Sequence, residues 1–359
     1  MSFLRSRLMF LIFISELKFS GPNNVVLSLI SGLKKMDLDV TVSALRKRQD
    51  DDYVARVEAL GGKVEKIGRL EPVTFFVTRM ANKYKPMIIN SHGIRADLAI
   101  LITKSFYNCN LLSTIHNVPY EDYLSRYGAL KSKVMLFAHS KVFKCQRIKK
   151  VAVSNNVRNK LLSRGAKNIH TVYNGVIFDN NENKLRRENL LAKLGLEKDR
   201  IKFVFCGHLD EIKQPLIVKE VAFHFSEYDF IILGDGPQRE EMESGPSNLL
   251  VKGRVNNVLD YMYVSDFFIM PSLTEGMPMA FIEALYSNLY PICSDIDIFK
   301  ELSSLPGISM RLFETGCSQS LKDVISSLNL DDNITNYLIA QQCFSDICMS
   351  QNYVALCDV

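Results

Sequence analysis

Residues 268–287 read FIMPSLTEGMPMAFIEALYS, and this stretch decides how the C-terminal half of the chain is interpreted. The apolar run that ends at Met270 is typical of a buried parallel strand. A loop follows, and Pro278 stands where a proline in the first turn of a helix is favoured, so we expect a helix from about Met279 to Ser287. Strand, loop and helix in this order form the repeating unit of a doubly wound α/β sheet.

The loop of this unit carries the residues expected to bind a ligand. The first amides of a helix have no intrahelical partner and the helix dipole favours an anion, so the start of this helix predicts a diphosphate site. Gly276 allows the backbone to approach that phosphate closely. Glu275 precedes the helix whereas Glu283 lies more than one turn inside it, so the two carboxylates are expected to contact different ends of one ligand. Carboxylate oxygens accept hydrogen bonds from vicinal sugar hydroxyls well.

Outward from this stretch, short apolar runs alternate with helix-length amphipathic segments along the whole chain, as in parallel sheets covered by helices. We expect a first strand series at 8–14, 39–44, 86–90, 110–114 and 150–154, and a second at 202–206, 229–233, 249–252, 267–270 and 290–293. The polar residues 179–200 between the series predict a linker and hence two doubly wound domains facing across a cleft. The expected division is 1–175, 176–333 and a C-terminal helical stretch, 334–359, that could pack back on the first domain.

The N-terminal apolar run and the cysteines bear on the class of protein. Leu8–Ile14 loosely imitates a signal peptide, but it has only seven residues, no small-residue cleavage site follows, and Gly21 opens a strand-to-helix turn, so we expect a first buried strand. No uncharged apolar stretch is long enough to span a membrane. Eight cysteines without a C-x-x-C pair or Cys/His metal spacing predict a reduced cytosolic protein without structural zinc.

The charge is divided unequally between the two halves. Residues 1–170 hold 29 Lys and Arg against 12 Asp and Glu, a net +17, whereas residues 171–359 have a net charge of −12. A basic half suggests an anionic partner, and both nucleic acid and a membrane surface qualify. The stretch Lys131–Lys150 interleaves seven cations with apolar residues, which fits either a membrane-docking helix or an ordinary amphipathic helix with one solvated face. Nucleic-acid binding is not expected, because no recognised binding motif accompanies the charge.

The motif E-G-x-P, followed by a glutamate eight positions after the first, resembles the signature of the family 4 glycosyltransferases, which have the GT-B fold of two Rossmann-like domains. The resemblance extends over nearly the whole chain as an ordered series of short segments. Those in the first domain are Ser20–Asn24, Thr114–Pro119, Val153-Ser154 and Tyr173–Val176. Those in the second are Gly207–Leu209 with Lys213, Leu233–Pro237 and Gly253–Val255.

The resemblance implies a site. Glu275 would contact the hydroxyls of the donor sugar and Glu283 the ribose, while Lys213 would neutralise the diphosphate. His116 would face the donor sugar from the first domain. From its place at another strand end, and not from the resemblance, His92 either lines the same cleft or has no functional role. The remaining donor-binding positions that the family pattern implies are Gly21, Gly234, Gly253, Arg254, Val255, Gly276, Met277, Pro278 and Met279.

His208 departs from the family pattern, which usually has an arginine at this position. A neutral imidazole offers one hydrogen-bond donor instead of a permanently charged fork, so diphosphate binding would depend more on Lys213, or Arg254 would reach in. Structural readings stay open for several candidates: His116 as a satisfied polar group, Lys213 as a surface lysine, and the Gly234 loop as an ordinary turn.

The reaction implied by the resemblance is retaining transfer of a hexose from a nucleotide sugar, with UDP as the first choice of nucleotide. Cations and amides rather than a metal would stabilise the leaving diphosphate, and no other cofactor is expected. The acceptor would be a lipid-linked saccharide or a glycan in capsule, O-antigen or exopolysaccharide synthesis. The basic N-terminal half would then hold the protein at the inner face of the cytoplasmic membrane. A nucleotide-sugar epimerase, a phosphorylase of this architecture and a non-catalytic donor-binding subunit are the alternatives, although no pyridoxal-phosphate lysine motif supports the phosphorylase.

Overall fold

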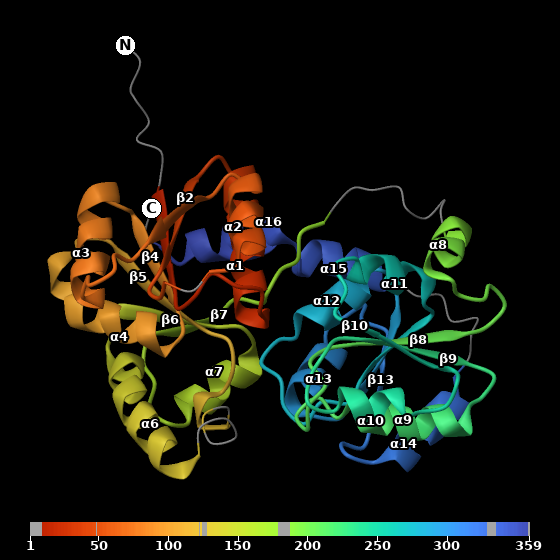
Figure 1. Cartoon of the computed structure of the whole chain (residues 1–359). Helices are drawn as coiled ribbons and strands as arrows, with labels where there is room; N and C mark the ends of the chain where they lie inside the picture. Colours follow the sequence, from red (N-terminus) through yellow and green to blue (C-terminus); the bar gives the residue numbers. More distant parts are fainter. Residues whose placement is uncertain are drawn as a thin grey trace. The chain divides into compact units, whose positions relative to one another are not determined.

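The computed structural model describes residues 9–47, 49–121, 123, 128–178, 187–328 and 335–357. The chain divides into two compact units (Figure 1). Unit 1 comprises Met1–Ile177 and Cys343–Val359, and unit 2 comprises Phe178–Gln342. The boundaries expected from the sequence were 175/176 and 333/334, and the last segment of the chain returns to unit 1 at Cys343.

Unit 1 contains a seven-stranded parallel sheet in the order β3-β2-β1-β4-β5-β6-β7. The strands are β1 (Met9–Ile14), β2 (Asp39–Ala44), β3 (Lys63–Lys66), β4 (Ile88–His92), β5 (Asn110–Ile115), β6 (Ile148–Ala152) and β7 (Ile169–Thr171). β1 lies between β2 and β4, and its residues Phe10–Ile14 are fully buried. The expected first buried strand is therefore present, with Leu8 outside the described residues.

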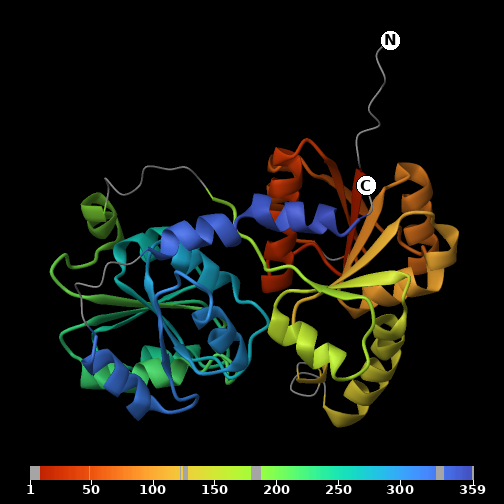
Figure 2. The ribbon, with the colours of Figure 1, turned by 180° about the vertical axis from the view of Figure 1, so that it is seen from behind.

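Helices cover both faces of this sheet. They are α1 (Gly21–Lys35), α2 (Asp51–Ala59), α3 (Val73–Tyr84), α4 (Ile94–Thr103), α6 (Ala129–Lys144), α7 (Asn155–Leu162) and α16 (Asp346–Ala355), with a short 3-10 turn, η1 (Lys104–Phe106). α16 lies against α1, as both views show (Figures 1 and 2). Gly32 permits this close packing, because a Cβ there would meet the carbonyl oxygen of Asp346 at 2.1 Å. The carboxylate of Asp346 in turn accepts hydrogen bonds from Ser31 and Lys35.

Unit 2 contains a six-stranded parallel sheet in the order β10-β9-β8-β11-β12-β13. The strands are β8 (Lys202–Cys206), β9 (Asp229–Leu233), β10 (Leu249–Gly253), β11 (Phe267–Met270), β12 (Tyr290–Ser294) and β13 (Arg311–Phe313). Its helices are α8 (Arg187–Leu194), α9 (Pro215–His224), α10 (Arg239–Glu243), α11 (Val258–Val264), α12 (Met279–Tyr286), α13 (Asp297–Ser303), α14 (Ser318–Ser326) and α15 (Asn336–Cys343), the last ending at the unit boundary. Stacked phenylalanines, among them Phe203, Phe230 and Phe267, form its core.

The strand order of each sheet predicts where a ligand can bind. Chain order reverses between β1 and β4 in unit 1 and between β8 and β11 in unit 2. In doubly wound sheets the loops at the carboxyl ends of the strands beside such a reversal separate and leave room for a ligand. The candidate residues quoted from the sequence lie mainly in these loops.

The structure corrects three expectations about elements. The edge strands β3, β7 and β13 were not expected, because they have only three or four residues and two of them carry charged or exposed side chains. The basic stretch Lys131–Lys150 is not one helix: α6 ends at Lys144, and Lys150 is a buried residue of β6 whose ammonium donates to the carbonyls of Cys145 and Ile148. The C-terminal helical stretch is two helices, α15 and α16, and only α16 packs on α1.

Within the described residues, no helix is both long enough and apolar enough to cross a membrane.

Candidate functional site

The loops at the carboxyl ends of β8, β9 and β10 are held together by backbone hydrogen bonds. Gly207 N donates to Leu233 O at 3.0 Å, and Gly234 N donates to Gly253 O at 2.8 Å. Gly234 has a φ of 141°, and a Cβ there would lie 1.8 Å from the carbonyl oxygen of Gly207. Only glycine therefore allows these two loops to approach, which gives the Gly234 loop a definite structural role.

Lys213 and Glu275 form an ion pair at this edge of unit 2. The ammonium of Lys213 donates to Oε1 of Glu275, and Ser272 Oγ donates to the same oxygen at 2.8 Å. The Glu275 side chain is only 8% exposed, and this cation and this hydroxyl supply hydrogen bonds to its buried oxygen. The reading of Lys213 as a plain surface lysine does not fit this contact.

A backbone bond fixes the loop that carries Glu275. Leu273 N donates to Ile212 O at 2.8 Å, which joins the loop after β11 to the loop after β8. Asp210 Oδ1 accepts from the amides of Ile212 and Lys213, both at 3.0 Å, and so shapes the turn that presents Lys213. The two loops beside the strand-order reversal thus form one connected surface.

Glu283 of α12 is close enough to Cys206, at the end of β8, to influence it electrostatically. Burial raises the pKa of Glu283 to about 7. Burial, with a smaller contribution from the charge of Glu283, also raises the pKa of Cys206 to about 12, while the nearby Lys213 opposes that shift. Cys206 is therefore next to both charged groups, and the thiol stays protonated beside them.

Pro278 is the N-cap of α12 rather than a residue of its first turn. Its backbone is extended, with φ −74° and ψ 126°, and the helix begins at Met279 without a side-chain cap. Gly276, Met277 and Pro278 are buried. Pro278 has no side-chain oxygen that could cap the helix, and the first amides of α12 follow directly after the loop that carries Glu275.

Three of the expected donor-binding residues, His208, Arg254 and Val255, are held less firmly than Lys213 and Glu275. The side chains of His208 and Arg254 are exposed, and within the described part of the chain neither makes a hydrogen bond or ion pair. Val255 is partly buried. Gly253 has a φ of 71°, and its missing side chain leaves room for Arg239, whose guanidinium would lie 3.1 Å from a Cβ there. Sequence reasoning did not single out Arg239.

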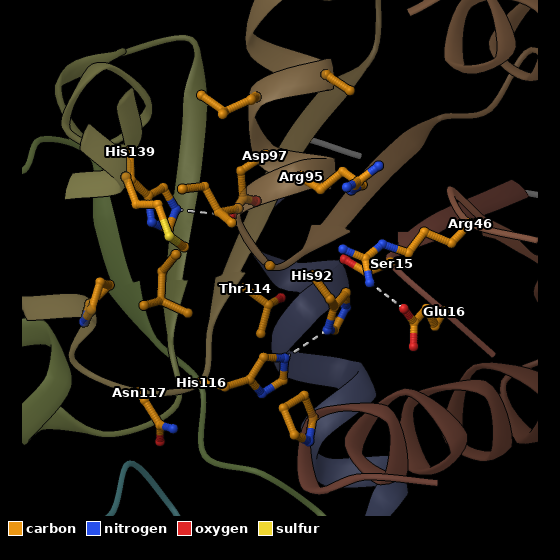
Figure 3. A pocket seen from close by; sticks show the side chains of 18 of the residues that line it. Ser15, Glu16, Arg46, His92, Arg95, Asp97, Thr114, His116, Asn117 and His139 are labelled. Carbon is orange, nitrogen blue, oxygen red and sulfur yellow. Dashed lines mark hydrogen bonds and ion pairs between the residues drawn. The ribbon is translucent and has the colours of Figure 1, made fainter. Parts of the chain in front are cut away.

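Unit 1 has a cavity of about 910 Å³ at the carboxyl ends of β1, β4 and β5 (Figure 3). The loop after β1 contributes Ser15 and Glu16, and the β4 and β5 ends contribute His92 and His116. Apolar side chains and cations from α3, α4 and α6 complete its wall, among them Val73, Leu98, Ile102, Lys131 and Met135. Gly21 does not line this cavity: it is exposed at the start of α1, and its neighbours Ser20, Pro22 and Asn23 reach the wall instead.

His92 and His116 lie side by side in this cavity. His92 Nδ1 and His116 Nε2 are 2.9 Å apart, and the ring centroids are 5.1 Å apart (Figure 3). Burial lowers the pKa of His116 to about 4 and, with the second imidazole, lowers the pKa of His92 well below its ordinary value. Both rings are therefore neutral near pH 7, and the two histidines work as one hydrogen-bonded pair.

A second buried polar cluster lines the same cavity and was missed from the sequence. Asp97 accepts hydrogen bonds from Ser91 at 2.6 Å and Ser113 at 2.7 Å. Its other oxygen lies 3.0 Å from His139 Nε2, and Tyr123 OH lies 2.8 Å from His139 Nδ1. The signal in the sequence was an aspartate followed by the apolar run Leu98–Ile102. His139 gave no signal, because it lies inside the basic stretch.

Among the residues that the structure describes, no group of three or more His, Cys, Asp or Glu side chains is placed to hold a metal ion. The expectation of a metal-independent reaction stays a prediction.

Comparisons with known proteins agree with this geometry. Residues 19–179 match the model of Glycosyltransferase Family 4, and residues 200–331 match the model of Glycosyl transferases group 1. The chain is 27% identical over 307 residues to the O-antigen biosynthesis glycosyltransferase WclY of Escherichia coli, with 80% of each chain covered. It is 31% identical over 143 residues to an Escherichia coli UDP-Gal:alpha-D-GlcNAc-diphosphoundecaprenol alpha-1,3-galactosyltransferase, with 36% of this chain and 37% of that protein covered.

One solved structure has the same fold. Anabaena Alr3699/HepE, in complex with UDP and glucose, matches with a TM-score of 0.80 at 15% identity and covers 97% of this chain and 99% of its own. The two family models together cover strands β2–β7 of the first sheet and β8–β13 of the second. The chain belongs to the family 4 glycosyltransferases and has their GT-B fold.

Proposed function

We propose that the protein transfers a hexose, with retention, from a UDP-sugar to a lipid-linked saccharide or glycan acceptor in the synthesis of a surface polysaccharide. The observation that carries the proposal is the Lys213–Glu275 pair in the loops next to the start of α12, where the N-cap Pro278 makes no side-chain hydrogen bond. A cation and a helix N-terminus suit a diphosphate, and a buried carboxylate suits sugar hydroxyls. WclY and the galactosyltransferase above, one named for O-antigen biosynthesis and the other for a UDP-Gal donor and a lipid-linked acceptor, support the choice of substrates.

Each residue has a proposed task. Glu275 orients the donor sugar and Glu283 binds the ribose. Lys213 and the backbone from Met277 to Met279 stabilise the charge that develops on the leaving diphosphate, without a metal. Removing one such stabilising group typically costs about 100- to 1,000-fold in turnover.

The outer surface of α3, α4, η1 and α6 supports docking at an anionic membrane. Large apolar side chains stand exposed there: Phe75, Ile102, Phe106, Leu130, Val134 and Phe137. On α6 the exposed Leu130, Val134 and Phe137 follow a helical stripe, and Lys131, Lys133 and Lys141 lie beside it. Ile102 and Lys131 also line the unit 1 cavity, so a lipid-linked acceptor held in the bilayer would meet the cavity at its mouth. We therefore propose that the protein acts at the inner face of the cytoplasmic membrane.

The test is turnover of a nucleotide sugar by the purified chain with a lipid-diphosphate saccharide as acceptor. A thermal-shift screen of UDP-, GDP- and ADP-sugars first identifies the donor, because a ligand that binds only the folded state raises its apparent stability. Lys213→Ala and Glu275→Ala are expected to lower turnover by about 100-fold or more, by the argument on charge stabilisation above. Lys219→Ala, an exposed lysine of α9 that donates to Glu241 and Ser244, is the matched control.

Three results would contradict the proposal. Wild-type turnover by the Lys213 and Glu275 variants would remove its chemical basis. Release of nucleotide without any acceptor would indicate an epimerase. Donor binding without transfer to any acceptor would indicate a non-catalytic subunit.

A further inference from the structure

Five side chains of unit 1 form a continuous chain of hydrogen bonds from the C-terminal helix to the cavity. Tyr353 OH of α16 is 2.9 Å from Thr114 Oγ1 on β5, which donates to Asn90 Oδ1 on β4 at 3.1 Å. Asn90 Nδ2 is 3.1 Å from His92 Nε2, and His92 Nδ1 is 2.9 Å from His116 Nε2. We call this set of residues the Tyr353–His116 chain.

The first link fixes the direction of all the others. Tyr353 is 1% exposed, and within the described residues Thr114 is the only hydrogen-bond partner of its hydroxyl. A buried hydroxyl proton without an acceptor is costly, so Tyr353 donates to Thr114. Thr114 then donates its own hydroxyl proton to the side-chain carbonyl oxygen of Asn90. The reverse direction would leave the buried proton of Tyr353 with no acceptor.

The orientation of the Asn90 side-chain amide determines which ring nitrogens of the two histidines carry a proton. Because its oxygen faces Thr114, its NH₂ group faces His92 and donates to Nε2. A neutral imidazole that accepts at Nε2 carries its proton on Nδ1, so His92 donates to Nε2 of His116. By the same rule His116 carries its proton on Nδ1, and within the described residues no acceptor lies against that nitrogen.

We infer that Tyr353, Thr114, Asn90 and His92 are positioning residues that hold His116 as its Nδ1–H tautomer, so that His116 donates a hydrogen bond to an oxygen of the bound saccharide. His116 lines the cavity, where such an oxygen can reach it (Figure 3). At this nitrogen His116 cannot act as the base that deprotonates an acceptor hydroxyl. The inference rests on the proposed function for the identity of the ligand, but the tautomer itself does not depend on it.

The experiment is long-range ¹H–¹⁵N NMR of the full chain with ¹⁵N-labelled histidine, which shows which ring nitrogen carries the proton. The signals are assigned with His92→Ala and His116→Ala. In the wild-type protein at pH 8 we expect Nδ1 of both His92 and His116 to be protonated. Protonation of His116 at Nε2 would overturn the inference.

Thr114→Val is the first test of the direction. It removes the link between Tyr353 and Asn90, so the Asn90 amide is free to turn and His116 becomes a mixture of both tautomers. Ser113→Ala is the matched control: Ser113 is the preceding residue of β5, and its hydroxyl bonds to Asp97 outside the Tyr353–His116 chain. A single Nδ1–H tautomer in Thr114→Val would overturn the role given to Thr114 and Tyr353.

Turnover separates this inference from the proposed function. A wrong tautomer in a catalytic histidine lowers kcat, so we expect Thr114→Val to lose at least about 10-fold in kcat with little change in KM for the donor. The Nδ1–H tautomer without any nucleotide-sugar turnover would leave the positioning network intact and refute the proposed function. Normal turnover together with an Nε2–H tautomer would refute only the positioning network.

Discussion

The two units differ in how they stabilise the buried polar side chains of their candidate sites. In unit 2 the groups are charged: Lys213 neutralises Glu275, and backbone hydrogen bonds between neighbouring loops hold both in place. In unit 1 the histidines are neutral, and side chains from β4, β5 and the distant α16 hold them. A charged site can be built from neighbouring loops, because one ion pair neutralises both charges and supplies most of the hydrogen bonds. A neutral hydrogen-bonded site needs every donor matched, and that takes residues from across the unit.

The largest effect is expected from Gly234→Ala, which tests whether contacts between neighbouring loops hold the unit 2 site together. The added Cβ would lie 1.8 Å from the carbonyl oxygen of Gly207, so the loops after β8 and β9 must separate. We expect the free energy of unfolding of unit 2 to fall by about 3 kcal/mol, the cost of forcing extra atoms into a packed place. Nucleotide binding should fall with it. Denaturant unfolding and calorimetry with UDP measure the two effects.

Gly316→Ala is the control for this prediction. Gly316 also has a positive φ, 79°, but nothing lies within 4 Å of its Cβ position. It should lose only the strain of a left-handed residue, about 1 kcal/mol. Equal losses in the two variants would show that contact between the loops does not hold the unit 2 site together.

Glu283→Gln is expected to raise the free energy of unfolding and at the same time to weaken nucleotide binding. The pKa of Glu283 in the folded protein is about 7, above the ordinary value of 4.5, so the folded state binds more protons than the unfolded state between these values. Stability therefore falls as pH rises through this window. The glutamine variant lacks this penalty and should be more stable than wild type by about 3 kcal/mol at pH 8, with no difference near pH 4.5.

Binding gives the other half of that prediction. If Glu283 holds the ribose, the same variant should bind UDP about 10-fold more weakly, because a carboxylate accepts from both ribose hydroxyls and an amide oxygen does so less strongly. Urea unfolding at the two pH values and calorimetry measure the effects, with Glu220→Gln on the exposed surface of α9 as the control. A variant that is more stable and binds UDP normally would remove Glu283 from the donor site.

The smallest effect concerns the outer surface of unit 1. Lys133 is exposed on α6, four residues from the exposed Phe137. One lysine near an anionic leaflet contributes about 1 kcal/mol, so Lys133→Gln should weaken binding to phosphatidylserine-containing vesicles about 5-fold. Vesicle co-sedimentation at low and high salt measures it, with Lys219→Gln in unit 2 as the control. Equal binding by wild type and Lys133→Gln would argue against docking through α6.

The regular elements were readable from the sequence where burial dominates. The strands 39–44, 202–206, 229–233 and 267–270 have the expected bounds, because buried parallel strands are continuous apolar runs. The edges of both sheets were not readable. β3 reads KVEK, with both lysines exposed, and such a segment is a strand only because β2 supplies its hydrogen bonds. The strand expected at 150–154 is present as β6 but begins at Ile148, and the basic run did not reveal that Lys150 is fully buried.

The sequence by itself determined the two-sheet architecture and the unit 2 candidates, because Glu275, Gly276 and Glu283 fall within nine consecutive residues whose local geometry is set by a strand, a loop and a helix. Only the tertiary structure decided what surrounds His116. Tyr353 and Thr114 are 239 positions apart and meet only because α16 returns to unit 1 and packs on α1. The direction of each hydrogen bond depends on all the partners in the chain of bonds. A local sequence pattern does not show which distant residues will become those partners.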